Sequence, residues 1–387
     1  MSKIDPIALA SDLIRCPSVT PDDRGAIGVL IAALEPLGFN CTILTFEEDG
    51  HPPVKNLFAR RGTEGSHFCF AGHTDVVPAG DTQAWSIDPF SAVQKDGQLW
   101  GRGASDMKSA IAAFVAAAAN NNDANNSISL LITGDEEGAA INGTRKVLQW
   151  MADNDQVMDH CLVGEPTNPE AFGEMVKVGR RGSINGWITV KGQQGHVAYP
   201  HRAKNPIPAL CHILAKMSAT PLDDGYENFQ PSSFQITDLN VGNHAHNVIP
   251  AKATARFNVR FNPNWTGAAV HQWVEEQVAA LNPDKDLSCH LETIISGEAF
   301  LTTDRSFIDV IAESIQTITG REPERSTTGG TSDARFIREY APVAEFGLVG
   351  ATMHQVDEHV SVDDIYQLEN VYGEILKRYF QTAGQSS

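Results

Sequence analysis

Histidine and carboxylate residues stand in short motifs that directly follow apolar, strand-like segments of this chain. The motif at 72–75, Gly-His-Thr-Asp, places His73 and Asp75 two residues apart, so both side chains lie on one side of an extended backbone. A histidine that binds a metal commonly donates its other ring N–H to a carboxylate. The pair therefore predicts a metal ligand, His73, that Asp75 orients. The competing interpretation is a surface pair at the end of a strand.

Acidic residues supply further candidate ligands. The motif Gly-Asp-Glu-Glu-Gly at 134–138 follows an apolar strand, and its three consecutive acids repel one another unless a cation or a shared proton relieves the repulsion. The alternative there is a solvated acidic turn. Asp106 opens an alanine-rich helix, where an acid also serves as a simple cap. Glu165, in Gly-Glu-Pro-Thr, and His354, in Thr-Met-His-Gln, are weak signals when each is taken alone.

Together, these residues match the needs of a two-zinc site. Zinc accepts histidine nitrogen and carboxylate oxygen, and two metals about 3.5–4 Å apart can share a bridging carboxylate and a water molecule. We expect two zinc ions per subunit, with cobalt able to replace zinc at one or both positions. Three residues are assigned to each metal. One metal is assigned to His73, Glu165 and Asp106. The other is assigned to His354, Glu137 and Asp106, so the two metals share the carboxylate of Asp106. Glu136 is left beside a ligand, where a general base is required.

The elements that position these motifs indicate an α/β domain interrupted by a second domain. Helical and strand patterns alternate in the first half of the chain, and this architecture resumes near 304. Helices are expected at 5–14, 24–37, 105–119, 304–319 and after 363. Strands are expected at 41–46, 56–60, 67–71, 128–133 and 159–163. We expect Ser105 to cap the helix that contains Asp106 in its first turn.

A different pattern occupies 183–292, in the order strand, helix, strand, strand, helix, strand. The segment Arg-Phe-Asn-Val-Arg-Phe at 256–261 alternates strictly, which predicts a strand with one buried face. We therefore expect an α/β catalytic domain at 1–179 and 294–387, with a mixed sheet flanked by helices. A smaller α+β domain is expected at 180–293.

Composition narrows the classes of partner. The 387 residues include 29 basic and 48 acidic side chains, a net charge of −19 that argues against nucleic acid and anionic membranes as partners. The six cysteines form no CxxC pair, which indicates a reducing compartment. We find no signal stretch and no run of eighteen apolar residues. A cytoplasmic location is expected.

The motifs resemble, in order and over nearly the whole chain, a two-zinc metallopeptidase family that includes aminoacylases, acetylornithine deacetylase and glutamate carboxypeptidase. Four segments look most like the desuccinylases of that family: 103–109, 179–183, 192–201 and 329–336. The resemblance implies that Asp106 is the bridge, Asp75 the orienting residue and Glu136 the general base. It also implies that the inserted domain is a lid and dimerisation domain, so that the protein is a homodimer. His196 would then reach the partner subunit's active site and stabilise the oxyanion.

The same resemblance implies hydrolysis of N-succinyl-LL-2,6-diaminopimelate to succinate and LL-2,6-diaminopimelate, a step of bacterial lysine and diaminopimelate biosynthesis. It places seven residues at this small-molecule N-acyl amino acid: Arg180, Ser183, Tyr199, Asn247, Arg260, Gly330 and Thr331. Arginine binds carboxylate through its planar fork, so Arg180 or Arg181, and Arg260, are candidates for the substrate's carboxylates. For Arg260 the alternative is a cross-strand ion pair.

Three other functions remain open from the sequence. The nearest is another N-acyl amino acid deacylase, such as an acetylornithine deacetylase, which would share the metal site. A metal-dependent exopeptidase is the second. An inert binding protein on the same fold is the third, because a fold alone does not fix a function.

Overall fold

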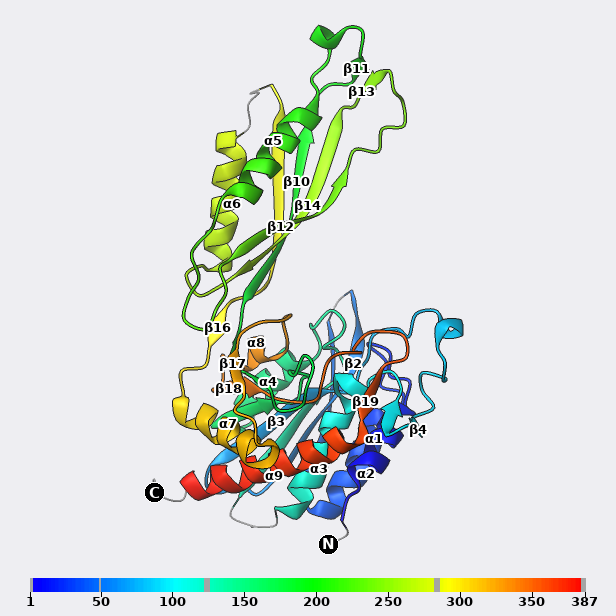
Figure 1. Cartoon of the computed structure of the whole chain (residues 1–387), viewed down its shortest axis with the longest axis vertical. Coiled ribbons are helices and arrows are strands. Elements are labelled where there is room, and N and C mark those ends of the chain that lie inside the picture. Colours follow the sequence, from blue (N-terminus) through cyan, green and yellow to red (C-terminus); the bar gives the residue numbers. More distant parts are fainter. Residues whose placement is uncertain (1–2, 49, 122–125, 282–285, 384–387) are drawn as a thin grey trace. The chain divides into compact units, whose positions relative to one another are not determined.

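The computed structural model describes residues 3–48, 50–121, 126–281 and 286–383 (Figure 1). The chain divides into two compact units, each of which is described by itself. Unit 1 consists of Met1–Val178, Thr302–Ser326 and Ser332–Ser387, and unit 2 consists of Gly179–Leu301 and Thr327–Thr331.

These bounds differ from those read from the sequence, because the structure also places residue 179 and the segments 294–301 and 327–331 in unit 2. Short-range pairing explains the difference. Phe300 pairs with Arg180 in a two-stranded antiparallel ladder. The Arg180 guanidinium also donates from Nη1 to the carbonyl of Gly330 at 3.0 Å. Both segments are therefore held by the start of unit 2.

Unit 1 contains a mixed eight-stranded sheet. Its central strands β6, β3 and β7 are parallel neighbours, whereas β1 and β2 are antiparallel at one edge. The strands in spatial order are β1 (Asn40–Glu48), β2 (His51–Arg61), β6 (Ser127–Thr133), β3 (His67–His73), β7 (His160–Val163), β18 (Val343–Glu345), β8 (Met175–Lys177) and β17 (Glu324–Ser326). A separate antiparallel sheet contains β19 (His359–Ser361), β5 (Gln98–Trp100) and β4 (Val93–Lys95).

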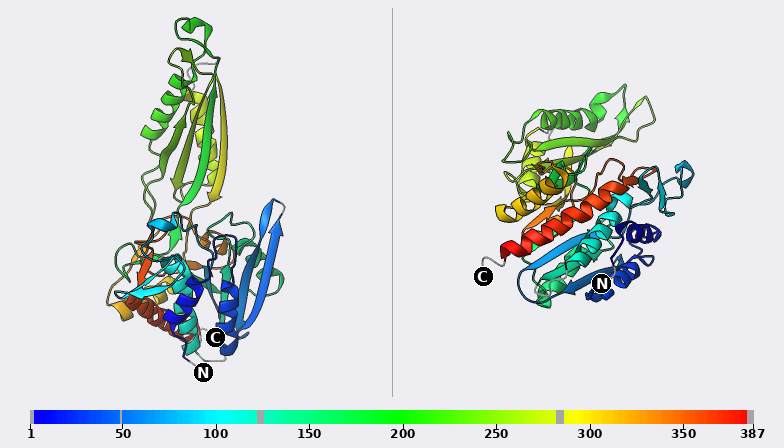
Figure 2. Two further views of the ribbon diagram at one scale, coloured as in Figure 1. Left: turned by 90° about the vertical axis from the view of Figure 1, so that its right-hand side faces the viewer. Right: turned by 60° about the horizontal axis from the view of Figure 1, so that its bottom comes forward.

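Helices cover both faces of the large sheet. The rings of Phe70 and Phe114 stack at 4.2 Å, and Tyr372 packs edge-on against both, so α3 and α9 lie side by side on one face (Figure 2). Phe58 belongs to the opposite face and contacts Trp150 of α4. The helices of unit 1 are α1 (Pro6–Ile14), α2 (Ala26–Leu34), η1 (Glu35–Leu37), η2 (Thr82–Ala84), η3 (Ala104–Lys108), α3 (Ser109–Asn120), α4 (Thr144–Asp153), α7 (Arg305–Thr319), α8 (Ala334–Ile337) and α9 (Val362–Ala383).

Unit 2 is a four-stranded antiparallel sheet backed by two helices. On β14, Phe257, Val259 and Phe261 are buried, as the alternating pattern predicts. The sheet contains β12 (Ser233–Asn240), β14 (Lys252–Phe261), β10 (Gly182–Lys191) and β15 (Ser288–Gly297), with helices α5 (Pro206–Ala219) and α6 (Gly267–Leu281). The short elements are β9 (Gly179–Arg180), β11 (Gly195–His196), η4 (Pro200–Arg202), β13 (Val248–Ile249) and β16 (Phe300–Leu301).

The entry into the alanine-rich helix differs from the sequence expectation. Asp106 has an extended backbone (φ −124°, ψ 96°), and the regular helix begins only at Ser109. Ser105 does not cap it, since its hydroxyl donates to the carbonyl of Val349 at 2.8 Å. The carboxylate of Glu358 instead accepts the N–H groups of this turn. No helix in the described part of the chain is both long and apolar enough to cross a membrane.

Candidate metal centre

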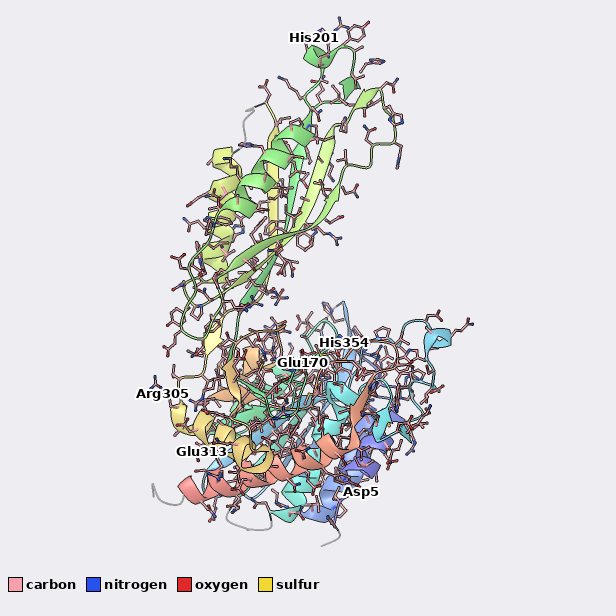
Figure 3. All side chains as sticks on the ribbon, viewed as in Figure 1. Asp5, Glu170, His201, Arg305, Glu313 and His354 are labelled. Carbon is pink, nitrogen blue, oxygen red and sulfur yellow. The ribbon has the colours of Figure 1, made fainter. Side chains whose placement is uncertain are left out.

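The candidate site begins at the carboxyl ends of the three parallel strands at the centre of unit 1. His73 is the last residue of β3, Glu137 follows β6, and Glu165 follows β7. Ligands of open α/β sheets commonly lie at such strand ends. Asp106 comes from η3, and His354 comes from the segment between β18 and β19, where it lies at the periphery of unit 1 (Figure 3). Five segments distant in sequence therefore contribute.

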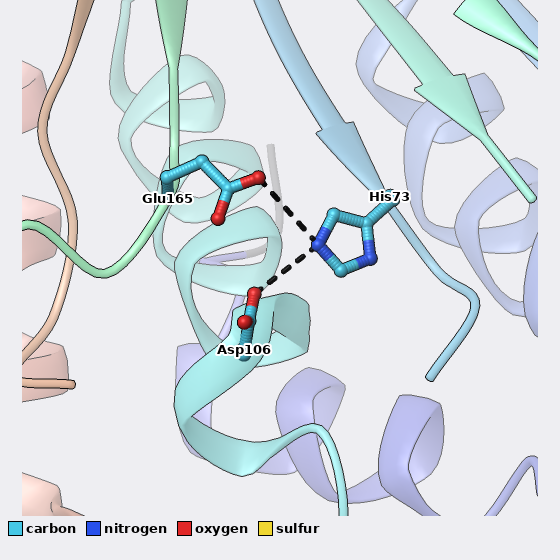
Figure 4. Close-up of side chains that lie close together, drawn as sticks. All are labelled: His73, Asp106 and Glu165. Atoms are coloured by element: carbon cyan, nitrogen blue, oxygen red, sulfur yellow. Dashed lines mark hydrogen bonds and ion pairs between the residues drawn. The ribbon is translucent and has the colours of Figure 1, made fainter. Parts of the chain in front are cut away.

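One cluster consists of His73, Asp106 and Glu165. The Nε2 atom of His73 lies 3.1 Å from Oδ1 of Asp106 and 3.7 Å from Oε1 of Glu165 (Figure 4). One potential ligand atom from each residue lies within 4.8 Å of the other two. All three residues are buried.

The second cluster shares Asp106 with the first. The Nε2 atom of His354 lies 2.8 Å from Oε1 of Glu137 and 3.3 Å from Oδ2 of Asp106. These ligand atoms also lie within 4.8 Å of one another. Each oxygen of Asp106 thus faces a different histidine, the arrangement that a bridging carboxylate requires.

The chemistry of these donors fits a pair of divalent cations. Each cluster offers one imidazole and two carboxylates, which are ligands that zinc accepts. Burial, together with the charges of Asp106 and Glu136, raises the pKa of Glu165 well above its ordinary value. Several buried carboxylates cannot ionise together without a compensating positive charge. Bound cations would supply that charge.

In the absence of a cation, the histidines provide the positive charge. Hydrogen bonds with Asp106 and Glu137 raise the pKa of His354 to about 10. Burial acts against protonation of His73, but the hydrogen bond with Asp106 and the nearby carboxylates outweigh it and raise the pKa of His73. Cations and protons therefore compete for the same nitrogen atoms.

Asp75 contacts His73 mainly through its backbone. The Nδ1 atom of His73 lies 2.9 Å from the carbonyl oxygen of Asp75 and 3.7 Å from its carboxylate. The carboxylate accepts the backbone N–H groups of Glu136 at 3.3 Å and Glu137 at 3.0 Å. Burial raises the pKa of Asp75 to about 6. The sequence suggested the contact with His73 but not this link to the acidic motif.

Glu136 lies next to the second cluster, and it belongs to neither group of potential ligands. Burial, followed by the charge of Asp333, raises the pKa of Glu136 well above its ordinary value. Asp333 is itself buried and accepts the Thr144 hydroxyl at 2.6 Å. Sequence reasoning assigned no role to Asp333, although Asp333 lies in the segment 329–336 together with Gly330 and Thr331.

The structure brings four of the predicted substrate residues together in unit 2. Arg180 contacts Gly330, and the charges of Arg180 and Arg181 add to burial in lowering the pKa of Arg260. Asn258 donates to the Ser183 hydroxyl at 3.1 Å and accepts from Nε of Arg260 at 3.1 Å. Asn258 therefore orients two predicted substrate residues, a role not read from the sequence even though Asn258 shares a strand face with Arg260. Thr331 is partly buried in the same unit.

His196, Tyr199 and Asn247 form a separate exposed group. The carbonyl of Asn247 accepts the N–H of Val197 at 3.1 Å, and Tyr199 donates its N–H to the carbonyl of His196. Nδ1 of His196 accepts the N–H of Ala198 at 3.1 Å, so the ring proton resides on Nε2. This donor faces solvent.

The two groups lie at opposite ends of unit 2. β11 and β13, which carry the His196 group, are at one end, and β16, which pairs with the strand of Arg180, is at the other (Figure 1). His201 in η4 marks the His196 end (Figure 3). One copy of unit 2 therefore does not gather all seven predicted substrate residues and His196 into one site.

Comparison with known proteins identifies the family. The family model described as peptidase family M20/M25/M40 matches residues 69–378. The chain belongs to this family. The M20 chain is 55% identical, over 100% of its own length and 98% of the relative's, to a succinyl-diaminopimelate desuccinylase of Parvibaculum lavamentivorans. It is 57% identical to the enzyme of that name from Caulobacter vibrioides, over 97% of this chain and 96% of the relative.

A solved structure bears out the fold. The YXEP protein of Bacillus subtilis, a dinuclear metal binding peptidase from the M20 family, aligns with a TM-score of 0.70 at 16% identity, over 97% of this chain and 98% of that one. The predicted metallopeptidase family and the α/β fold class are confirmed. This M20 member is a metal-dependent hydrolase, and its two clusters are its candidate dinuclear centre.

Proposed function

We propose that the chain hydrolyses the amide bond of N-succinyl-LL-2,6-diaminopimelate to give succinate and LL-2,6-diaminopimelate, as part of bacterial lysine and diaminopimelate biosynthesis. The observation that carries the chemistry is the pair of clusters that share Asp106. The full-length similarity to enzymes named succinyl-diaminopimelate desuccinylase supports the choice of substrate.

The proposed cofactor is two zinc ions, with cobalt as a substitute at one or both positions. His73 and Glu165 would hold one ion, Glu137 and His354 the other, and Asp106 both. When bound, such a pair supplies Lewis-acid chemistry that acidifies water and polarises the amide carbonyl.

Glu136 is the proposed general base. It accepts a proton from the attacking water and returns that proton to the nitrogen of the leaving amine. Three features support this role: its position beside Glu137, its burial, and a raised pKa caused first by that burial. A carboxylate with a raised pKa holds the transferred proton better than an ordinary glutamate does.

Arginines of unit 2 are proposed to bind the carboxylates of the substrate. Burial lowers the pKa of Arg260, and its buried Nη1 has no protein partner in the described ranges. A substrate carboxylate would complete its hydrogen bonding. Arg180 and Ser183 would contribute from the same end of unit 2.

His196 is proposed to stabilise the oxyanion in the active site of a second copy, within a homodimer. Its exposed Nε2–H donor and its place at the far end of unit 2 from Arg180 support this arrangement. Tyr199 and Asn247 would contact substrate from the same segment. The six unpaired cysteines support a cytoplasmic location.

The decisive experiment is hydrolysis by protein loaded with zinc or cobalt. N-succinyl-LL-2,6-diaminopimelate is compared with its N-acetyl analogue, N-acetylornithine and dipeptides, and free amine is measured. We expect kcat/KM to be highest for the succinyl substrate. A preference for N-acetylornithine would assign another deacylase, and a preference for dipeptides an exopeptidase. No turnover by protein that binds two metals would favour an inert binding protein.

A further inference from the structure

Glu358 carries a buried carboxylate that no step of the proposed reaction uses. Its residue is 0% exposed. One carboxylate oxygen, Oε1, accepts the backbone N–H groups of Gly103 at 3.1 Å, Ser105 at 2.9 Å and Asp106 at 3.2 Å. The other oxygen, Oε2, accepts from Nη1 of Arg102 at 2.6 Å. Both oxygens therefore accept hydrogen bonds from the protein.

Arg102 links this carboxylate to the segment of His354. It is 2% exposed, and its Nη2 atom lies 3.4 Å from the carbonyl oxygens of both His354 and Pro78. Its guanidinium group lies over the ring of Trp85, 5.2 Å from the centroid. The planar fork of arginine can make these contacts at once, whereas a lysine ammonium group cannot.

These contacts connect two segments that each carry a candidate metal ligand. Glu358 binds the backbone N–H of Asp106, and the carbonyl of Glu358 accepts the N–H of Gly101 at 2.9 Å. His354 lies four residues before Glu358 in the sequence. We propose that Glu358 and Arg102 are positioning residues of the metal centre, which hold Asp106 and His354 at the spacing that two cations require. This inference rests on the proposed two-metal function.

The backbone conformations of Asp106 and His354 indicate that these ligands need contacts from outside regular secondary structure to hold them in place. Asp106 has an extended backbone and precedes the regular helix, so regular helical hydrogen bonds do not fix its backbone. His354 and Asp357 both have φ of +62°, a region that residues other than glycine occupy infrequently. Asp357 is anchored by the N–H and hydroxyl of Ser86 at 2.7 and 2.8 Å. Glu358 fixes the next position of the same segment.

The opposite charges of Glu358 and Arg102 also fit a position next to the candidate metal ligands. A lone buried carboxylate at Glu358 would add negative charge beside Asp106, whereas the ion pair with Arg102 at 2.6 Å compensates that charge locally. Breaking a buried pair leaves one uncompensated charge. Residues that orient metal ligands typically change metal affinity or activity about 10–100-fold when they are mutated.

The test compares metal affinity, kinetics and stability in three full-length variants. Glu358→Gln keeps the size of the side chain but removes the charge paired with Arg102. Arg102→Lys keeps the charge but loses the planar fork. Asp304→Asn is the matched control, because Asp304 also accepts a backbone N–H, from Phe307, and pairs with His160 at 3.0 Å. His160 begins β7, at the end of that strand away from Glu165.

Zinc binding to chelator-treated protein is measured by isothermal titration calorimetry, and kcat and KM are measured on the loaded enzyme. For Glu358→Gln we expect about 10–100-fold weaker binding of at least one zinc, lower kcat and a KM within about twofold. Asp304→Asn should bind zinc as the wild type does. If Glu358→Gln does not fold, Arg102→Lys decides the matter, and we expect its zinc affinity also to fall.

Two outcomes separate the inference from the function on which it rests. If both Glu358→Gln and Arg102→Lys bind two zinc ions as tightly as the wild type, with a lower melting temperature as the sole change, the pair is structural and the inference is overturned. If Glu358→Gln cannot be obtained, a wild-type affinity for two zinc ions in Arg102→Lys also overturns the inference. If the wild type itself fails to bind two metals, the proposed function fails first.

Discussion

The backbone carbonyl oxygen of Asp75 lies 2.9 Å from Nδ1 of His73. The ring therefore donates its Nδ1–H to the main chain and turns Nε2 toward Asp106. Because a carbonyl cannot be removed by a side-chain substitution, this part of the histidine's orientation persists in any Asp75 variant. The carboxylate of Asp75 instead holds the N–H groups of Glu136 and Glu137.

Replacement of Asp75 by asparagine tests whether its carboxylate holds the loop of Glu136 and Glu137 in place. The amide retains one acceptor oxygen but loses the charge and the second acceptor, so the loop that carries Glu136 and Glu137 is less firmly held. We expect kcat to fall about 10–100-fold while both metals remain bound. Steady-state kinetics and metal analysis measure the two quantities. Loss of His73 ligation with an unchanged Glu136 loop in a crystal structure of the variant would contradict this division of roles.

Replacement of Glu136 by glutamine removes the proposed general base without altering a ligand. Proton transfer by a positioned group contributes about 10²–10⁴-fold to rate, so kcat should fall by that factor. Two metal ions should still bind, since Glu136 belongs to neither cluster. Turnover near that of the wild type, with both metals present, would mean that another group takes the proton.

The ligand residues could be predicted from the sequence because each stands at the end of an apolar strand or in a short motif. Parallel neighbours β6, β3 and β7 then bring Glu137, His73 and Glu165 to one edge of the sheet. Glu358 and Arg102 could not be predicted in the same way. Their contact spans 256 positions, and nothing local distinguishes a buried, paired glutamate from an exposed one.

A local sequence pattern can predict which face of a strand is buried. The apolar residues of the alternating segment at 256–261 are indeed buried on β14. Unit boundaries depend on long-range pairing instead. Residues 327–331 lie in unit 2 through contacts such as that of Arg180 with Gly330, which local composition does not reveal. The turn at Asp106 likewise follows from the distant carboxylate of Glu358, not from Ser105.

Metal binding and metal-free stability should depend on pH in opposite directions. Without a cation, hydrogen bonds with Asp106 and Glu137 raise the pKa of His354 from 6.5 to about 10. A raised pKa gives the folded, metal-free protein stability that is complete below pH 6.5 and is lost as pH rises through about 10. A cation must displace this proton, so metal affinity should instead increase with pH over the same range.

Thermal unfolding of the chelator-treated protein measures the first trend, and calorimetric zinc titrations at several pH values measure the second. The difference between wild type and His354→Gln isolates the contribution of this ring from those of other groups. The variant should lose the fall in metal-free stability between pH 6.5 and 10 that His354 causes. Identical pH profiles for the two proteins would show that His354 carries no such proton.

Replacement of Arg260 by alanine tests recognition of the succinyl carboxylate. Hydrogen bonds to charged groups contribute about 1.5–3 kcal/mol, so kcat/KM for the succinyl substrate should fall about 10–100-fold. The N-acetyl analogue lacks that carboxylate and should change little. Arg256→Ala is the matched control, because Arg256 lies on the same face of β14 but is exposed and pairs with Asp238 at 3.4 Å. Such exposed pairs contribute little, so both activities should be kept. Equal losses on the succinyl and acetyl substrates in Arg260→Ala would leave Arg260 with a structural role through Asn258 and would remove it from substrate selection.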